Sequence, residues 1–172
     1  MKKRAACIFS AVIIIVLSVV ILVPAVDSKA AGIAAEENMN DDKLTNVSVP
    51  SGTTSIGARA YYGCDNLMSV IIPEGVTSIG ESAFAMCPQL AYVQIPTTLK
   101  SVGAGAFAGD GALVRLNFSG SNNHFFYSDG VLYDTGTTEI IAYMPGNRNT
   151  KYVMPVSVNK IDKYAFWGAK YL

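Results

Sequence analysis

The chain has 172 residues and carries 13 basic and 13 acidic side chains. This length corresponds to about one domain. Beyond the first four residues there is no block of Lys and Arg, so the sequence lacks the electrostatic footprint of a nucleic-acid-binding protein, and nucleic acid is excluded as a partner.

Residues 1–30 contain the three parts of a secretory signal: a basic start at 2–4, an apolar run at 5–23 and a small-residue exit at 28–30. The apolar run is longer than the usual signal core and matches the ~20 residues that span a bilayer, so an uncleaved membrane anchor is the alternative. In both cases we expect the rest of the chain to be secreted or held at the cell surface. It would then touch the membrane only through this segment.

The part that follows the signal is mildly acidic. Residues 1–30 hold four basic side chains and one acidic side chain, which leaves 9 Lys+Arg against 12 Asp+Glu and a net charge of −3. Residues 31–43 are polar, with acidic residues at their end, and we expect them to form a flexible lead-in.

A repeat of 23 residues begins after the lead-in. Residues 47–69 read VSVPSGTTSIGARAYYGCDNLMS, residues 70–92 read VIIPEGVTSIGESAFAMCPQLAY, and residues 93–115 read VQIPTTLKSVGAGAFAGDGALVR. A shorter fourth copy, YVMPVSVNKIDKYAFWGAKYL, occupies residues 152–172. Prolines, an alanine–aromatic pair and a late leucine recur at equivalent positions, which predicts a repeat solenoid.

Within one copy, Leu67, Val70 and Ile72 alternate with free positions, which is the periodicity of a strand. A proline then ends the strand ladder, at a place where sheets tolerate it. Val76 and Ile79 mark a second, shorter extended piece. The following residues, 81–87, carry an Ala-Phe pair inward, and we expect a helical turn or a 3₁₀ segment there.

A single coil has too little apolar surface to be stable, so neighbouring coils must stack Phe above Phe and Leu above Leu. The sequence therefore predicts a mainly β, right-handed solenoid of about 23-residue coils over residues 44–172, with short helical or 3₁₀ turns and a sheet on one face.

The period breaks between residues 116 and 151. Two β-prone runs flank residues 134–137 (DTGT), which is a hairpin pattern. A disordered insertion is the alternative, but disordered segments are poor in aromatic residues. Aromatic residues are frequent in this segment, which favours a hairpin-bearing irregular repeat that keeps the solenoid continuous; among them are Phe125, Phe126, Tyr127, Tyr133 and Tyr143.

The unit V-x-I-P-x-x-V-x-x-I-G-x-x-A-F-x-x-C-x-x-L, which residues 70–90 match at every specified position, resembles the BspA-like leucine-rich repeat of bacterial surface proteins. The resemblance covers residues 44–172, and the irregular segment is similar to one common in that family. It implies an adhesin or a cell-contact protein that binds an extracellular protein or a glycan. It implies no catalytic residue and no cofactor, so the chain is not expected to be an enzyme. Tyr61 replaces the usual Phe, and Asp110 and Ala169 replace the usual Cys.

The residues offer little for catalysis or metal binding. His124 is the single histidine and lies in a polar run, where we expect a loop. A zinc site needs three or four ligands, and a Ser-His or Cys-His site needs a nucleophile beside the histidine. Asp41 and Asp42 belong to the lead-in and form no calcium-loop pattern. We therefore predict no catalytic and no metal site.

Cys64 and Cys87 occupy the same position in successive copies. Stacked coils would place their Cα atoms about one strand spacing apart, ~4.8 Å, which is compatible with a disulfide in an oxidising compartment. The alternative is a ladder of buried thiols that act as small apolar residues.

The solvent face of the predicted sheet is the candidate binding surface. By alternation, its free positions include an aromatic, an aliphatic and a cationic residue, a composition favoured at interface hot spots; ordinary exposed strand side chains are the alternative. The predicted partner-binding residues are Ser69, Ile71, Tyr92, Gln94, Arg115 and Asn117.

Two functions remain open. The chain is a binding module, or it is a structural spacer or fragment of a larger multidomain surface protein. Leu172 comes one strand before the fourth coil would be complete, so we expect either a longer protein or an end that pairs with another chain.

Overall fold

The computed structural model describes residues 32–33, 45–136 and 138–172, and residues 32–33 through their backbone only. This part of the chain is a solenoid of about five turns with coils of about 23 residues. The predicted signal segment (1–30) and residues 31 and 34–43 of the predicted lead-in lie outside the described residues. Residues 32–33, also assigned to the lead-in, form a strand of the solenoid.

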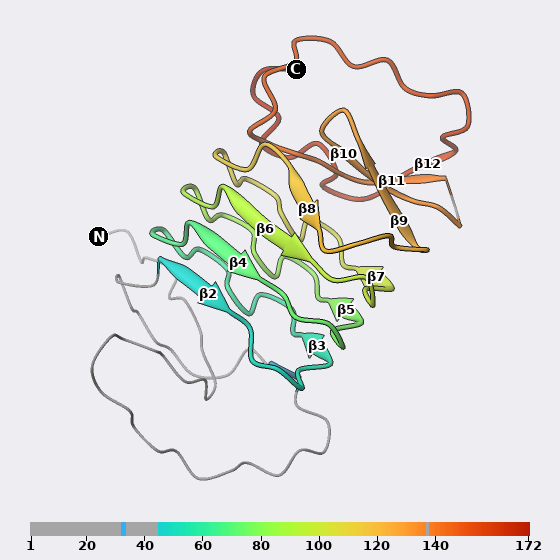
Figure 1. The fold of residues 1–172 in the computed structure, drawn as a ribbon. Coiled ribbons are helices and arrows are strands. Elements are labelled where there is room, and N and C mark those ends of the chain that lie inside the picture. Colours follow the sequence, from blue (N-terminus) through green and yellow to red (C-terminus); the bar gives the residue numbers. More distant parts are fainter. Residues whose placement is uncertain (1–31, 34–44, 137) are drawn as a thin grey trace, which may run out of the picture.

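A parallel sheet runs along one side of the solenoid (Figure 1). Its strands, in spatial order, are β2 (Asn46–Ser48), β4 (Ser69–Ile71), β6 (Tyr92–Ile95) and β8 (Leu116–Phe118). Val47, Val70, Val93 and Leu116 are partners across these strands. Each step therefore advances the chain by 23 residues, as the repeat predicts.

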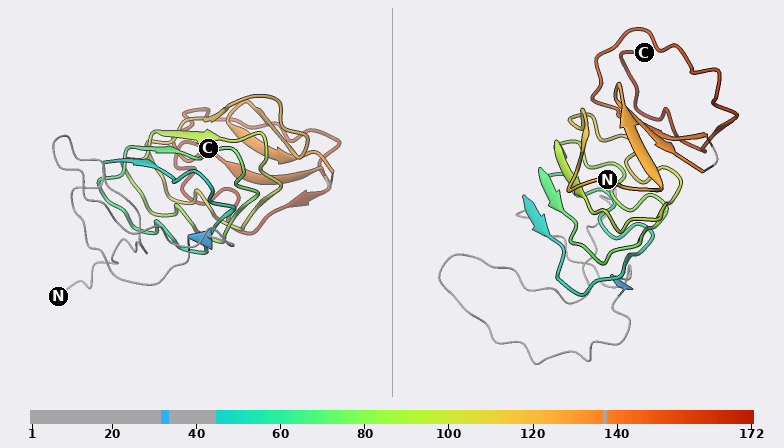
Figure 2. Two further views of the ribbon diagram at one scale, coloured as in Figure 1. Left: turned by 60° about the horizontal axis from the view of Figure 1, so that its bottom comes forward. Right: turned by 45° about the vertical axis from the view of Figure 1, so that its right-hand side comes forward.

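A second parallel sheet lies along another side, so the solenoid carries two sheets where the sequence predicted one (Figure 1). Figure 2 shows the same stack of coils from two further sides. Its short strands are β1 (Gly32–Ile33), β3 (Ser55–Ile56), β5 (Ser78–Ile79) and β7 (Ser101–Val102). The register again advances by 23 residues from Ile56 to Ile79 to Val102. The second extended piece expected from Val76 and Ile79 is the strand β5.

The irregular segment forms a third sheet with β12 of the last coil. The strands β9 (Phe125–Ser128), β10 (Val131–Asp134) and β11 (Glu139–Tyr143) pair antiparallel in chain order. This arrangement confirms the hairpin predicted around residues 134–137. β11 then pairs in parallel with β12 (Lys160–Ile161), which returns the chain to the solenoid geometry.

The core contains the stacked rings that the repeat predicts. Tyr61 stacks on Phe84 with ring centroids 5.1 Å apart, and Phe84 stacks on Phe107 at 5.8 Å. All three side chains are buried. Full burial of a Leu, Ile or Phe side chain is worth roughly 1.5–3 kcal/mol, and the stacking of successive coils is what removes these rings from water.

The prediction of helical or 3₁₀ turns at residues 81–87 and at their repeat equivalents was wrong, because the described residues contain only turns there. Ser82 and Met86 have φ angles of 53° and 63°, in the left-handed region that interrupts a right-handed helix. Their N–H groups donate to carbonyl oxygens of the next coil, Ser82 to Ala104 at 3.1 Å and Met86 to Ala108 at 2.8 Å. Hydrogen bonds between coils thus replace those that a helix would make within the turn.

The described residues include no helix long and apolar enough to cross a membrane.

Within the part of the chain that the structure describes, the last coil, residues 152–172, is more exposed than the coils before it. Met154, Ile161 and Leu172 have 44%, 45% and 47% of their surface exposed. The residues at the same repeat positions in the second copy, Ile72, Ile79 and Leu90, are at most 2% exposed. These three inward side chains of the last coil therefore keep nearly half of their surface in contact with solvent, whereas Ala165 of the same coil is buried.

Candidate functional site

The outer face of the sheet β2-β4-β6-β8 brings the six predicted binding residues into two rows across the strands. Ser69 and Tyr92 are partners in one row, which Arg115 continues immediately before β8. The other row is formed by Ile71, Gln94 and Asn117. The pleat produces this arrangement, because Val70, Val93 and Leu116 between them point into the core.

The side chains at the centre of this face are open to solvent. Ile71 is 43% exposed and Tyr92 is 39% exposed. Tyr92 Oη donates to Gln94 Oε1 at 3.3 Å, and Ser69 Oγ donates to Asn46 Oδ1 at 2.5 Å. These contacts hold the polar side chains against the sheet and leave the apolar surface of Ile71 uncovered.

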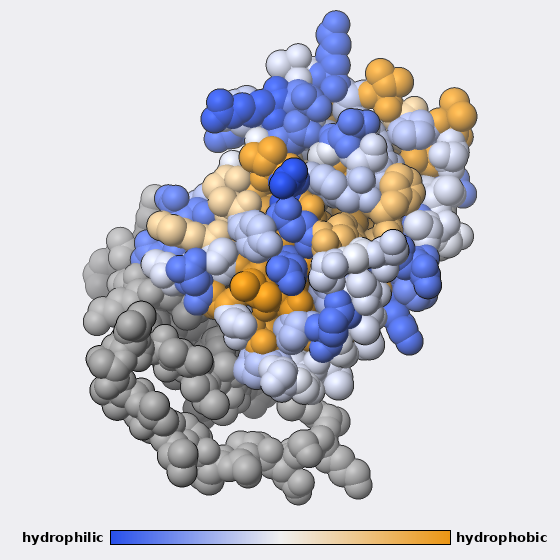
Figure 3. Space-filling model, viewed as in Figure 1, coloured by the Kyte–Doolittle hydropathy of each residue, from blue (hydrophilic) through white to orange (hydrophobic). Residues whose placement is uncertain are grey.

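Two exposed apolar residues at one margin of this face are not among the predicted binding residues. Met68 precedes β4 and Val114 precedes Arg115, and both side chains are largely exposed. Each follows a fully buried leucine, Leu67 or Leu113, directly. Two free positions separate each of these leucines from the next inward residue, Val70 or Leu116, and counting the first of the two as outward would have identified Met68 and Val114. Figure 3 shows hydrophobic surface gathered over this sheet, with hydrophilic side chains beside it.

Arg115 is the cation of the predicted strip and lies beside the irregular segment. Tyr127 Oη donates to the carbonyl oxygen of Val114 at 2.9 Å, next to Arg115. Burial raises the pKa of Tyr127 above its usual value, and the charge of Arg115 opposes that shift. The irregular segment therefore supports one end of the sheet face.

The comparisons with known proteins identify the fold family. A family profile described as "BspA type Leucine rich repeat region" matches residues 33–172 in six copies. The chain belongs to this family.

Solved structures show a similar fold. The pneumococcal vaccine antigen PcpA is similar at 22% identity and a TM-score of 0.71, over 78% of this chain and 34% of that one. A leucine-rich cell surface protein of Faecalibacterium prausnitzii A2-165 is similar at 27% identity and a TM-score of 0.69, over 77% of this chain and 35% of that one. The BspA-type chain thus spans about a third of the length of these two proteins. No curated protein matches it in sequence.

Repeats of this family are typically binding modules without catalytic activity. His124 is exposed, in the connection between β8 and β9. Among the residues that the structure describes, no group of three His, Cys, Asp or Glu side chains could hold a metal ion.

The cysteine position of the BspA-type repeat lies in the core. Cys87 is a free, buried thiol whose Sγ donates to the carbonyl oxygen of Tyr61 at 3.0 Å. It is not joined to Cys64, so the predicted alternative of a buried thiol that acts as a small apolar residue is confirmed for Cys87. Burial, and then the neighbouring Asp110, raise the pKa of this thiol far above its usual value.

Asp110 occupies the cysteine position of the third copy and is fully buried. Its Oδ1 accepts a hydrogen bond from the N–H of Cys87 at 2.8 Å, whereas Oδ2 is buried without a hydrogen-bond partner among the described residues. Burial raises the pKa of this carboxyl group well above its ordinary value, so the neutral acid is favoured. Its position within the core gives it a part in stability rather than in binding.

Proposed function

We propose that this chain is an extracellular binding module that contacts a partner protein through the outer face of the sheet β2-β4-β6-β8. The observation that carries the proposal is the strip formed by Ile71, Tyr92 and Arg115, in which an aliphatic, an aromatic and a cationic side chain stand exposed on neighbouring strands. Tyr and Arg are enriched at the centres of protein interfaces, where they fill desolvated pockets.

The rigidity of the sheet supports this assignment. The strands are joined in a regular parallel register, and the residues beneath the face, Val70 and Val93, are completely buried. A partner that binds such a ladder does not have to order its backbone, because the strands are already ordered, and this lowers the entropic cost of binding. Ser69, Gln94 and Asn117 supply hydrogen-bonding groups around the apolar centre.

The family and one similar structure favour an extracellular location, and with it an external partner. The chain is a repeat protein of bacterial surface-protein type, and one similar solved structure at 27% identity is a cell surface protein. Residues 1–30 have the composition of a secretory signal. Mass spectrometry of culture medium and envelope fractions tests this step: a chain that begins near Ala31 supports export with cleavage. A membrane-held chain that retains Met1 supports an anchor, and a cytoplasmic chain contradicts the proposal.

Biolayer interferometry with the full chain tests the binding face. The probes are purified extracellular-matrix proteins: a collagen, a laminin and a fibronectin. We expect saturable binding to at least one of them, weakened about tenfold or more by Tyr92→Ala and by Arg115→Ala, since hot-spot truncations cost on the order of 2 kcal/mol.

Matched controls lie away from this face. Tyr171→Ala and Lys100→Ala also remove one exposed aromatic and one exposed cationic side chain, and should leave binding unchanged. Equal losses in the control and face variants would refute the assignment of the face. An absence of saturable binding would favour the structural-spacer function instead.

A further inference from the structure

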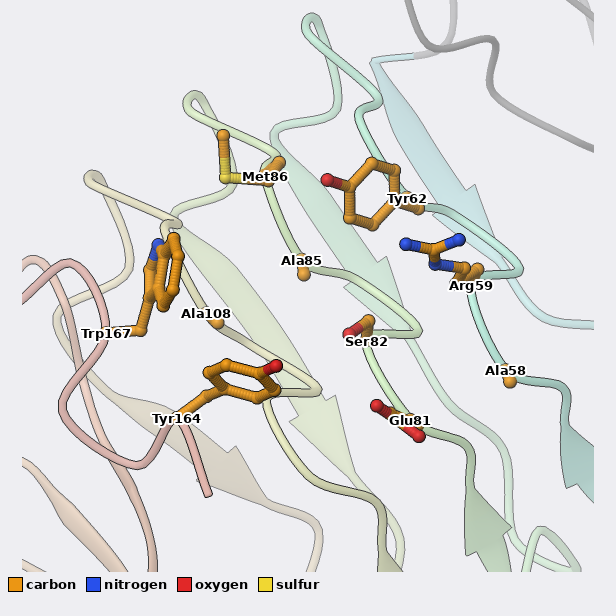
Figure 4. A pocket seen from close by; sticks show the side chains of 10 residues that line it. All are labelled: Ala58, Arg59, Tyr62, Glu81, Ser82, Ala85, Met86, Ala108, Tyr164 and Trp167. Carbon is orange, nitrogen blue, oxygen red and sulfur yellow. The ribbon is translucent and has the colours of Figure 1, made fainter. Parts of the chain in front are cut away.

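A groove on another side of the solenoid is built by the turns that connect the coils. Its volume is about 550 Å³, which lies within the range of about 300–1,000 Å³ typical of small-molecule sites. Figure 4 shows Arg59 and Tyr62 on one side of this groove and Tyr164 and Trp167 on the other. None of the six residues predicted for the sheet face lines it.

The repeat explains why a hollow forms here. Tyr62, Ala85, Ala108 and Trp167 occupy the same position in the four regular copies, so two alanines lie between two large aromatic residues. The turn of the last coil lies directly beside that of the third copy, since Gly109 N–H donates to the carbonyl oxygen of Trp167 at 3.3 Å. Tyr62 and Ala108 are two coil spacings apart, about 10 Å, and Trp167 forms the wall beyond.

The polar groups of the groove remain available to a ligand. Among the described residues, no hydrogen bond is made by the carboxylate of Glu81, by the hydroxyl of Ser82 or by the indole N–H of Trp167. Arg59 lies over the ring of Tyr62, 5.0 Å from its centroid. A positive donor, Arg59, and a negative acceptor, Glu81, therefore line the same opening. This pair of opposite charges favours a neutral ligand with many hydrogen-bonding groups.

The backbone around the groove is already paired. The N–H groups of Arg59, Gly63, Ser82 and Met86 all donate to carbonyl oxygens of the next coil, at 2.8–3.1 Å. Peptides that bind by strand addition need unpaired backbone groups at an exposed edge. These turns do not offer such an edge, so recognition must rely on ring faces and polar side chains.

Trp167 presents the largest open ring surface. Its side chain is 56% exposed, and Tyr164 packs against it edge-on with the ring centroids 5.5 Å apart. Lys163 lies over the ring of Tyr164, 4.7 Å from its centroid, and the described residues place no cation over the ring of Trp167. Exposed Trp and Tyr side chains combine an apolar face with a polar edge. This combination matches a sugar ring, whose C–H face is apolar and whose rim carries hydroxyl groups.

We propose that this groove binds a neutral oligosaccharide. One sugar ring stacks on Trp167, the chain crosses the floor formed by Ala85 and Ala108, and its hydroxyl groups reach Glu81 and Arg59. This site is separate from the sheet face proposed to bind a protein, so either can fail without the other.

The full chain is titrated with three neutral tetrasaccharides, a β-1,4-linked glucose tetramer, an α-1,4-linked glucose tetramer and a β-1,4-linked N-acetylglucosamine tetramer. Trp167 is the single tryptophan of the sequence, so intrinsic tryptophan fluorescence reports on this groove alone. We expect a saturable change in that fluorescence with at least one tetramer, and the same dissociation constant from isothermal titration calorimetry.

Variants then test the groove by calorimetry, after far-UV circular dichroism has verified their folding. Trp167→Ala and Tyr62→Ala remove the two walls, and each should weaken binding about tenfold, which corresponds to ~1.4 kcal/mol. Ala108→Gln fills the floor while both walls remain, and should also weaken binding. Tyr92→Ala, which removes an exposed ring from the sheet face, should have no effect.

Three results would overturn the proposal. The first is that none of the tetrasaccharides binds. The second is that a proline-rich decapeptide binds in the groove and the sugars do not, which would assign the aromatic walls to a peptide. The third is that Tyr92→Ala weakens sugar binding as much as Trp167→Ala, which would place the sugar elsewhere.

Discussion

Replacing Asp110 with asparagine should remove a large part of the pH dependence of folding. Asparagine keeps the oxygen that accepts the hydrogen bond from the N–H of Cys87, but it cannot ionise. In the wild-type chain the carboxyl group is fully buried, and burial raises its pKa well above the ordinary value of 3.8. The two proteins therefore differ mainly in whether a charge must enter the core as the pH rises.

The sign of the effect follows from proton linkage. Above the unfolded pKa of 3.8 the unfolded chain releases a proton that the folded chain retains, so the free energy of unfolding falls as the pH rises towards the folded pKa. The slope is about 1.4 kcal/mol for each pH unit. Between about pH 4 and pH 7 the loss is therefore at most about 4 kcal/mol, a large fraction of the stability of a typical domain.

Urea denaturation at four pH values between about 4 and 7, followed by far-UV circular dichroism, measures this difference. We expect the variant to be close to the wild type at the lowest pH and progressively more stable above it. Asp65→Asn, which changes an exposed carboxylate, is the matched control and should follow the wild type. Parallel curves for the wild type and Asp110→Asn would refute the assignment of a neutral, buried acid.

Three further predictions concern the coils themselves. Gly80→Ala should destabilise the chain by several kcal/mol, on the order of a severe core substitution, because the new Cβ would lie 2.4 Å from the backbone nitrogen of Ala58. Gly111→Ala, where a Cβ meets no atom within 4 Å, should change the melting temperature little by comparison. The thiol of Cys87 should react with a thiol reagent at pH 8 only as fast as the chain unfolds, because burial raises its pKa and blocks access of the reagent. Rapid labelling of Cys87 in the native chain would contradict its position in the core. Glu74→Gln should lower stability at pH 7 but not near pH 2. Hydrogen bonds hold the pKa of this exposed carboxyl group at about 2 in the folded chain, against 4.5 in the unfolded chain. The stabilisation by the ionised group is therefore lost as the pH falls from about 4.5 to about 2. Thermal melts of both proteins across this range measure the effect, and a constant difference at every pH would show that ionisation of Glu74 plays no part.

The Glu74 prediction rests on contacts that join three coils. Glu74 Oε1 accepts hydrogen bonds from the N–H of Thr97 at 3.0 Å and from Ser119 Oγ at 2.7 Å, and Oε2 accepts one from Thr97 Oγ1 at 2.8 Å. The hydrogen bond from Ser119 is the first cause of the lowered pKa. Ser119→Ala should therefore shift the pH dependence in the same direction as Glu74→Gln, by a smaller amount.

The period of the sequence was enough to predict the main architecture. Val47, Val70 and Val93 are partners in the structure because a 23-residue step returns each chain segment to the same place in the next coil. The alternation around these residues also predicted which side chains face solvent, and the turn residues 134–137 predicted the hairpin of β10 and β11. These features depend on patterns within one or two coils, which a single sequence displays directly.

Other features depend on how one coil lies against the next. Ser82 and Met86 adopt left-handed backbone conformations because their N–H groups bond to the following coil, a constraint that no local pattern contains. The groove likewise exists only because stacking places Trp167 of the last coil beside the turn of the third copy, although 59 residues separate Trp167 from Ala108 in the chain. The sequence by itself thus determined the period, the inward and outward faces and the family. The tertiary structure decided the turns, the second sheet and the groove, because contacts between coils select one backbone conformation and one set of neighbours from several that the local sequence allows.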